Sequence, residues 1–483
     1  MFSRTPAHLA AVLGLAALVA CATNPVTGEK EISLMSEEQE IALGQQYDVE
    51  VRKQMRPLDN PEVQQYVERI GMNLAKRSHR PNLPWHFTVV DVPAVNAFAL
   101  PGGYIYITRG ILAYLDDEAE LAGVLGHEIG HVTARHSAQQ YTKATGGQLG
   151  LLALGIFVPA ARPFGQLAET ALSLLFLKHG RDDELQSDRL GVEYAAAGGW
   201  DPRGVPEFLT TLSRISAETD RSGIPNWLST HPQPEDRVVK VQETVAKVVS
   251  PGADFRTDRA QYLDVVDGLV FGDNPEDGIV RGNAFLHPAM RFALEFPEGW
   301  QVANSAAQVV AKAPNADRYV LLQLEQEPQG RTLEEIAVRG MQRRGLQPLQ
   351  GQTTEINGLD AHVGLYRGQL QGLGDVGVRG AYIVQDRTVY LLVGLAPAQG
   401  FEAADAAFAQ TIRSFRPLSR AEAEDVRPNL VDLYTVRAGD TWASIAERAA
   451  RGAVDAGTLA IMNNSDVRQP PRPGDRIKIV VEG

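Results

Sequence analysis

The stretch GHEIGH at residues 126–131 places two histidines four positions apart, with a glutamate directly after the first. Residues four apart share one face of an α-helix. His127 and His131 can therefore bind one Zn²⁺ through their imidazole nitrogens, at about 2.0–2.1 Å. Glu128 is rotated by about 100° from His127, so it can act on a water molecule as a general base. The pattern predicts a metal site for hydrolytic chemistry.

The residues around this motif predict a capped helix. Asp117, followed by Glu120, is typical of a capping box at a helix start. The expected helix continues to about Ser137. Its apolar stripe is Leu121, Val124, Leu125 and Val132. His136 comes five residues after His131, about 140° round such a helix, so we expect it to point away from the metal and to have a surface or packing role.

A second segment offers the further ligand that a catalytic zinc usually takes from the protein. The stretch RDDELQSD at 181–188 contains Glu184 and Asp188, four apart on one helix face. One of these carboxylates can bind the metal, and the other can accept the N–H of a ligand histidine and fix its tautomer. Most such pairs are solvated helix charges, but the two-histidine motif upstream favours a metal site.

Five segments together resemble the gluzincin metallopeptidase family that contains the CAAX prenyl proteases, HtpX and the periplasmic BepA-type proteins. They are NPVTGEKEISLMSEEQE at 24–40, NAFALPGGYIYITRGIL at 96–112, LGHEIGHVTARH at 125–136, ELQSDRLG at 184–191 and STHPQPEDRV at 229–238. The resemblance covers roughly residues 30–250. It implies a zinc endopeptidase with one Zn²⁺ per chain, Glu184 as the third ligand and Asp188 in support of the site.

The resemblance gives a further histidine a role. His231 matches a His-Pro histidine that can approach the zinc and hold the enzyme latent. Peptide hydrolysis also needs a donor for the tetrahedral oxyanion, and His231 and Arg237 are the candidates. His179 can compete as a ligand, but we expect a loop role for it. The remaining histidines without a partner at ligand spacing are His79, His86, His287 and His362.

A β-hairpin is expected before the motif helix. The residues from Asn96 to Leu100 and from Tyr104 to Thr108 have strand character, and Pro101-Gly102-Gly103 forms the turn between them. An edge strand can bind an extended peptide through main-chain hydrogen bonds. The candidate substrate-binding residues are therefore Asn96, Ala97, Phe98 and Ala99. An ordinary structural hairpin is the alternative.

The N-terminus is typical of an exported lipoprotein. Residues 1–20 have a short positive start and an apolar run of twelve at 9–20, which fits a signal peptide better than a membrane span. The run ends at Cys21, the only cysteine, in a sequence that resembles a bacterial lipobox. We expect acylation of Cys21 and, with Ala22 following it, anchoring at the periplasmic face of the outer membrane of a Gram-negative bacterium.

Composition along the chain predicts several domains and an α+β fold class. A mainly helical zincin-type domain with a small sheet is expected over 21–250, where 144–177 is either a mobile flap or a buried hairpin. A linker rich in Asp, Gly and Pro at 251–283, an α+β accessory domain at 284–418 and a module at 432–480 follow. That module resembles LysM, a small βααβ fold that often binds peptidoglycan.

Charge and family resemblance limit the partners. The net charge of −13 and the absence of a long basic run exclude a typical nucleic-acid-binding protein. The resemblance implies misfolded or unassembled envelope proteins as substrates, and a role in protein quality control or outer-membrane protein assembly. A chaperone with a latent metal site and a peptidoglycan-binding scaffold are the alternative functions.

Overall fold

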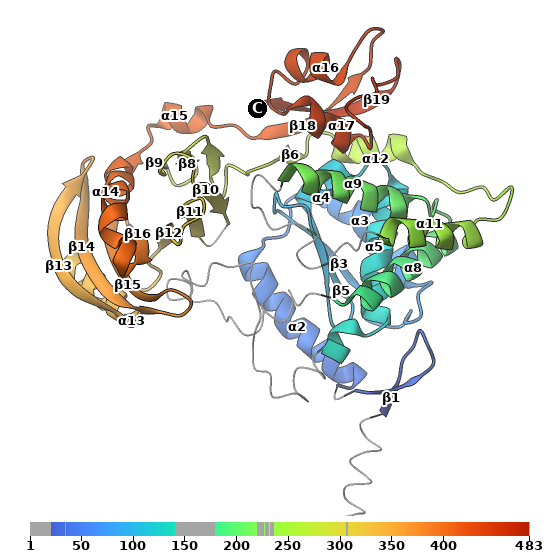
Figure 1. Ribbon diagram of the computed structural model, residues 1–483, viewed down its shortest axis with the longest axis horizontal. Helices are drawn as coiled ribbons and strands as arrows, with labels where there is room; N and C mark the ends of the chain where they lie inside the picture. The colour runs from blue at the N-terminus through green and yellow to red at the C-terminus, as the bar shows by residue number, and fades with distance from the viewer. Residues whose placement is uncertain are drawn as a thin grey trace, which may run out of the picture.

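The chain forms three domains in the computed structural model (Figure 1). The structure describes residues 21–33, 35–140, 179–219, 227, 231, 236–305 and 308–482. The signal peptide expected at 1–20 and the flap or hairpin expected at 144–177 lie outside these residues. The combination of a helical domain, a strand-rich domain and a small mixed module confirms the predicted α+β class.

The first domain is mainly helical and contains one small sheet. Its helices are α2 (Glu37–Gln54), α3 (Pro61–Ala75), α4 (Arg109–Tyr114), α5 (Glu118–Thr133), α8 (Arg181–Ala197), α9 (Gly204–Thr219), α11 (Arg237–Val248) and α12 (Arg259–Val266). The sheet has the order β3 (His86–Val90), β5 (Tyr104–Thr108), β4 (Ala97–Leu100). The expected hairpin forms, with Ala97 opposite Ile107 and Leu100 opposite Tyr104. A short hairpin of β1 (Cys21–Thr23) and β2 (Lys30–Ile32) precedes them.

Helix α5 runs through the middle of the first domain. Asp117 caps its start by accepting a hydrogen bond from the backbone N–H of Glu120, and every residue from Glu118 to Thr133 is buried. A helix buried on all sides belongs in a core rather than at a surface. Helices α3, α8 and α9 pack around it. The two-histidine motif is therefore held on a helix that is buried along its whole length.

The second domain is built on a curved antiparallel sheet. Its strand order is β10 (Gln301–Asn304), β11 (Gln308–Lys312), β12 (Tyr319–Leu324), β16 (Thr388–Pro397), β15 (Gly374–Gln385), β14 (Leu359–Leu370) and β13 (Leu346–Ile356). Helix α14 (Ala398–Ser414) covers one face through Phe408, and α13 (Leu333–Arg343) covers the other through Met341. A smaller sheet contains β17 (Arg416–Pro417), β9 (Phe292–Glu295), β8 (Ala284–His287) and β7 (Ile279–Arg281).

The third domain has the βααβ order expected of a LysM module. Its elements are β18 (Asn429–Thr435), α16 (Trp442–Arg448), α17 (Ala456–Met462) and β19 (Arg476–Glu482), with β18 and β19 antiparallel. Helix α15 (Arg420–Asp425) precedes it. The module lies directly on the first domain, next to α9 and α12 (Figure 1).

The expected linker at 251–283 is an ordered part of the molecule. It contains α12, the short strand β6 (Val270–Phe271), which pairs with β18, and β7. Tyr262 and Val266, four residues apart on α12, are buried in the core of the first domain. The many Asp, Gly and Pro residues predicted a linker, but this short apolar face is sufficient to dock the segment.

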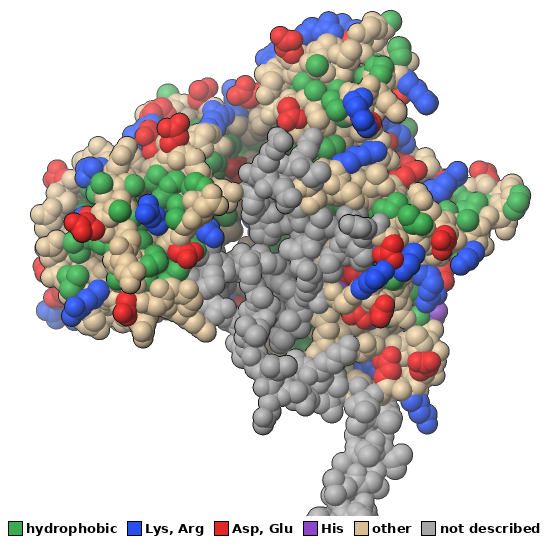
Figure 2. All heavy atoms as spheres, viewed as in Figure 1, with side chains coloured by type: hydrophobic (Ala, Val, Ile, Leu, Met, Phe, Trp, Pro, Cys, Tyr) green, Lys and Arg blue, Asp and Glu red, His purple; other side chains and the backbone are tan. Residues whose placement is uncertain are grey.

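Basic and acidic side chains are interspersed on the face of the molecule shown in Figure 2. Within the described residues, no helix has the length and apolar character needed to cross a bilayer.

Candidate metal centre and active site

Two close helices bring the motif on α5 to the acidic segment on α8. A Cβ atom added at Gly126 would lie 3.1 Å from the Cα of Gly191, and one added at Gly130 would lie 3.1 Å from the Cα of Ser187. The helices therefore meet backbone to backbone at these glycines. This approach places His127 and His131 of α5 beside residues of the first turns of α8.

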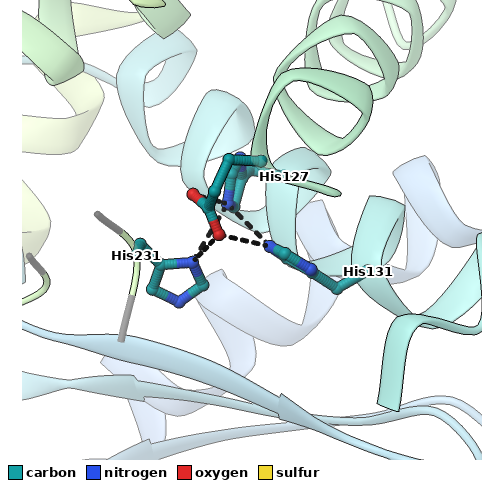
Figure 3. Close-up of side chains that lie close together, drawn as sticks. His127, His131 and His231 are labelled. Atoms are coloured by element: carbon teal, nitrogen blue, oxygen red, sulfur yellow. Dashed lines mark hydrogen bonds and ion pairs between the residues drawn. The ribbon is translucent and has the colours of Figure 1, made fainter. Parts of the chain in front are cut away.

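Four side chains direct their donor atoms at one point (Figure 3). The donors of His127, His131, Glu184 and His231 all lie within 4.8 Å of one another. The Nε2 atoms of His127 and His131 are 3.0 Å apart, and Nε2 of His131 is 3.5 Å from Oε1 of Glu184. Ligands of a tetrahedral zinc at normal bond lengths are about 3.3–3.4 Å apart. The donor set and its spacing therefore fit a tetrahedral metal ion.

Asp188 and Arg237 fix the orientation of two of these four side chains, His127 and Glu184. Oδ1 of Asp188 lies 2.9 Å from Nδ1 of His127, so the ring donates there and keeps its Nε2 lone pair for the metal. Arg237, fully buried, donates to both oxygens of Asp188 at 2.7 and 2.8 Å and lies 2.9 Å from Oε2 of Glu184. The guanidinium is thus bound to two carboxylates. It orients them and is not placed as the oxyanion donor that the sequence suggested.

The carboxyl group of Glu128 has a different environment. It is buried, and neither of its oxygens has a hydrogen-bond partner among the described residues. Its Oε1 lies 3.6 Å from Nε2 of His231. Burial, and then the nearby charge of Glu184, raises the pKa of Glu128 well above its usual range. A carboxylate in such a place is readily protonated, as a general base requires.

Burial also sets the protonation of the donors. It lowers the pKa of His127 and, more strongly, that of His131, so both imidazoles are neutral, which is the form that binds metals. Burial lowers the pKa of His231 to about 3. The same cause raises the pKa of Glu184 to about 7, against the opposing effects of His127 and Arg237.

His231 and Trp227 lie close to the residues that precede β4. The backbone N–H of Trp227 donates to the carbonyl of Val95 at 2.9 Å, and the Trp227 ring stacks on His231 with centroids 4.1 Å apart. Nδ1 of His231 is 3.0 Å from Oε1 of Glu184 and 3.4 Å from Nε2 of His127. His231 therefore takes the fourth corner of the donor group.

The sequence of the domain that holds this site has relatives. Residues 61–245 match the protein family described as Peptidase family M48, and residues 434–480 match the LysM domain. The chain carries an M48 peptidase domain. This confirms the resemblance to the gluzincin metallopeptidases and the LysM resemblance of the last module.

Individual relatives are proteases by name, and some are named metalloendopeptidases. The chain is 31% identical over 255 residues, half of its length, to the beta-barrel assembly-enhancing protease of Escherichia coli, and covers 52% of that protein. It is 33% identical over 192 residues, 39% of its length, to the mitochondrial metalloendopeptidase OMA1 of Arabidopsis thaliana, and covers 38% of it. The chain thus spans about half the length, or less, of these curated relatives. Among solved structures, a cyanobacterial PsbP from Synechocystis gives a TM-score of only 0.23 at 12% identity, over 30% of this chain and 98% of that one.

The candidate substrate strand forms an edge of the sheet in the M48 domain. Strand β4 pairs with β5 on one side, and in the described residues no strand pairs with its other side. Ala97, Phe98 and Ala99 lie on β4, and Asn96 directly precedes it. The sequence could place these residues on a hairpin, but their position on the edge strand became evident only from the strand order.

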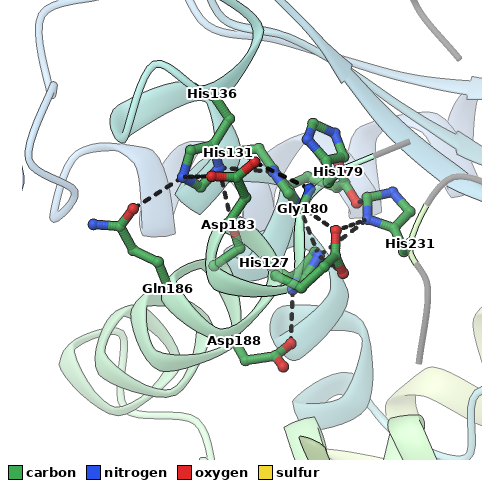
Figure 4. A network of polar contacts seen from close by, with 12 residues as sticks. His127, His131, His136, His179, Gly180, Asp183, Gln186, Asp188 and His231 are labelled. Carbon is green, nitrogen blue, oxygen red and sulfur yellow. Dashed lines mark hydrogen bonds and ion pairs between the residues drawn. The ribbon is translucent and has the colours of Figure 1, made fainter. Parts of the chain in front are cut away.

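Two histidines lie closer to the M48 site than the sequence indicated (Figure 4). His136 is buried, with its Nδ1 2.9 Å from Nδ1 of His131, instead of pointing away. The helix ends at Thr133, and Arg135 has the left-handed φ of 61°, so helical spacing no longer relates His131 to His136. His179 lies just before α8, and its ring centroid is 3.9 Å from that of His131.

Residues 1–20 of the predicted lipid-anchor signal are not described by the structure, which begins at Cys21. Cys21 begins β1, where it is paired with Ile32. The β1–β2 hairpin is tied to the M48 domain, since the side chain of Asn24 donates to the carbonyl of Ala134 at 3.2 Å. Acylation of Cys21 stays a prediction from the sequence.

Proposed function

We propose that the chain is a zinc-dependent endopeptidase of the bacterial cell envelope, with Glu128 as general base. The observation that carries the proposal is the convergence of His127, His131 and Glu184 on one point, beside a buried carboxyl group without a hydrogen-bond partner. This is the donor set of a hydrolytic zinc site, with three protein ligands and a further position for water or substrate.

The residues of this site would have separate roles in peptide hydrolysis. Bound Zn²⁺ supplies Lewis-acid chemistry, by which a water molecule is acidified and a carbonyl is polarised. His127, His131 and Glu184 would hold the ion. Glu128 would take a proton from the attacking water at its carboxylate and later deliver it to the leaving amine. Its raised pKa suits both steps, because the group must hold the proton between them.

In this conformation the enzyme would be latent. His231 takes the corner of the donor group at which water must act, and Trp227 is bonded to the residue two positions before β4. An extended substrate that adds to the edge strand β4 would meet the same two residues. Activation therefore requires His231 to leave the donor group and Trp227 to leave the residues that precede β4. Once displaced, His231 is also a candidate donor for the oxyanion.

We infer the cellular setting from the sequence and from the names of the relatives. A relative named for enhancing β-barrel assembly supports substrates among misfolded or unassembled envelope proteins. Acylation of Cys21 would hold the enzyme at the periplasmic face of the outer membrane. The LysM module makes peptidoglycan a candidate ligand.

The substitution Glu128→Gln tests the chemistry. It removes the base and retains the shape of the side chain, so we expect cleavage of unfolded casein to fall by about 10²–10⁴-fold while bound zinc stays at one per chain. A variant that cleaves casein normally would contradict the proposal. A variant that cleaves nothing, yet fully restores envelope function in a deletion strain, would instead favour the chaperone function.

The substitution His231→Ala tests latency. If the blocked form holds most of the population, its removal should raise kcat/KM for casein by about tenfold or more, with zinc still bound. His287→Ala in the second domain is the matched control and should change nothing. Lower activity with unchanged zinc content would contradict latency and assign His231 to the oxyanion.

A further inference from the structure

We propose that His136 and Gln186 form a relay of hydrogen bonds between neutral groups, which fixes the tautomer of His131 and thereby supports metal binding. His136 is a positioning residue in this account, because it acts on the metal through His131. The inference rests on the proposed metal site, and it assigns a role to a histidine that neither helical spacing nor the ligand set indicates.

The relay consists of consecutive contacts from the buried ring of His131 to the half-buried side chain of Gln186 (Figure 4). Nδ1 of His131 lies 2.9 Å from Nδ1 of His136, and Nε2 of His136 lies 2.9 Å from Oε1 of Gln186. His136 is 1% exposed. The hydroxyl of Ser187 lies 3.4 Å from Nδ1 of His136, and Oδ1 of Asp183 lies 3.7 Å from its Nε2.

The proton positions follow from the chemistry of neutral imidazole. To bind a metal through Nε2, His131 must carry its proton on Nδ1. Nδ1 of His136 must then accept that proton's hydrogen bond, so the proton of His136 lies on Nε2. That N–H needs an acceptor in a buried place, and Oε1 of Gln186 provides one. At each contact in the series, one group therefore donates a hydrogen bond and the next accepts it.

The two ligand histidines are therefore oriented in different ways. His127 donates to Asp188, an ionised group whose charge is balanced by Arg237. His131 donates to a neutral ring. The metal site already contains the carboxyl groups of Glu128 and Glu184, and a further carboxylate behind His131 would add a buried negative charge at a high cost. A histidine–glutamine relay gives the same orientation without that charge.

A dedicated backbone turn places His136. Arg135 has φ 61°, and its guanidinium donates to Oε1 of Glu40 on α2 and to the carbonyl of Met35. Glu40 is itself bound to Arg80 at 2.8 Å. A non-glycine residue in the left-handed region costs about 1–2 kcal/mol, and these bonds hold it there. The turn ends α5 and directs His136 back to His131.

Zinc affinity of the full chain tests the relay without reference to catalysis. His136→Leu should weaken zinc binding by about 10–100-fold, measured by competition with a chromophoric chelator. His136→Asn, whose side-chain oxygen can lie near the former Nδ1, should restore most of the affinity. Gln186→Leu should weaken binding, whereas Gln186→Glu, which keeps an acceptor, should not.

His79→Leu is the matched control, since His79 is a histidine bonded to Tyr194 of α8 and makes no contact with the donor group among the described residues. It should bind zinc like the wild type. Equal losses in His136→Leu and His136→Asn would mean that the ring only fills space, and would overturn the relay. Unchanged affinity in both would overturn it too. Binding of two zinc ions by the wild type but one by His136→Leu would instead assign His131, His136 and His179 to a second metal site. A wild type that binds no zinc would reject the proposed function itself.

Discussion

Glu184 gives the metal-free site a pH dependence of its own. Burial raises its pKa from the usual 4.5 to about 7 in the folded chain. The folded state therefore binds this proton more tightly than the unfolded state does. The resulting stabilisation is complete below about pH 4.5 and is lost as the pH rises through 7. Between these limits it amounts to about 3 kcal/mol.

We predict that chelator-treated protein has a thermal midpoint that falls between pH 5 and pH 8 more than that of Glu184→Gln. The glutamine variant lacks the titrating group, so the difference between the two isolates this carboxyl group from all others. Zinc should abolish the difference at pH 8 in the wild type, because a bound cation favours the ionised carboxylate. Parallel midpoints for both proteins across this range would contradict the prediction.

At the scale of residues, the sequence predicts those site members whose relation is local. His127 and His131, or Glu184 and Asp188, are related by four residues of helix, and this geometry does not depend on the rest of the fold. His136 was misjudged because the same rule was extended past the end of the helix. The cause, the left-handed turn at Arg135, depends on Glu40, ninety-five residues earlier in the chain.

At the scale of elements, the site depends on how closely α5 approaches α8. Gly126 meets the Cα and the carbonyl oxygen of Gly191 at 3.1 Å from its would-be Cβ, and backbone atoms cannot move aside as a flexible side chain can. Any larger residue there must separate the helices. Since His127 follows Gly126 and Glu184 lies on α8, such a separation would also spread the metal donors.

We predict that Gly126→Val lowers the free energy of unfolding by about 1–3 kcal/mol and weakens zinc binding measurably. Gly400→Val is the matched control: Gly400 is also a helical glycine, on α14, but its would-be Cβ has no neighbour within 4 Å. Urea unfolding and chelator competition measure the two effects. Wild-type zinc affinity in a folded Gly126→Val protein would show that the donors do not depend on the close crossing.

Element prediction was less successful where apolar patterns are short. The capped helices, such as α5 after Asp117, follow from local signals that the sequence shows directly. Helix α12 did not, because three buried residues among many polar ones resemble a linker. Its partners lie in α3, α5 and the third domain, and a single sequence cannot reveal that such a face will find a surface to cover.

At the scale of the whole molecule, the LysM module shares a buried apolar core with the M48 domain. Four of its apolar residues belong to the same buried cluster as the core of the first domain, namely Val431, Ile461, Met462 and Val480. Asn464 donates to Oε1 of Glu120, in the first turn of α5, at 3.0 Å. Arg259 of α12 joins Asp116 to the carbonyl of Arg476. Deletion of the module would therefore expose the core of the peptidase.

Lys478 places a cation inside this junction. It is fully buried on β19, and its ammonium donates to the carbonyl of Leu115, the C-cap residue of α4. A cation there complements the negative end of the helix. Burial lowers the pKa of Lys478 to about 8, against the opposing charges of Asp116 and Glu120, so the group is charged at neutral pH.

We predict that Lys478→Met destabilises the M48 domain as well as the module. The variant loses a charge-assisted bond and leaves the Leu115 carbonyl unsatisfied, a cost of about 1.5–3 kcal/mol. Arg468→Met is the matched control, because Arg468 is an exposed cation of the same module, paired with Asp466; a surface change of this kind costs at most about 0.5 kcal/mol. Hydrogen exchange of the amides of α4 and α5 separates the two outcomes. Faster exchange there in Lys478→Met alone would show that the module stabilises the start of the catalytic helix, whereas faster exchange confined to residues 432–480 would show that the two domains merely touch.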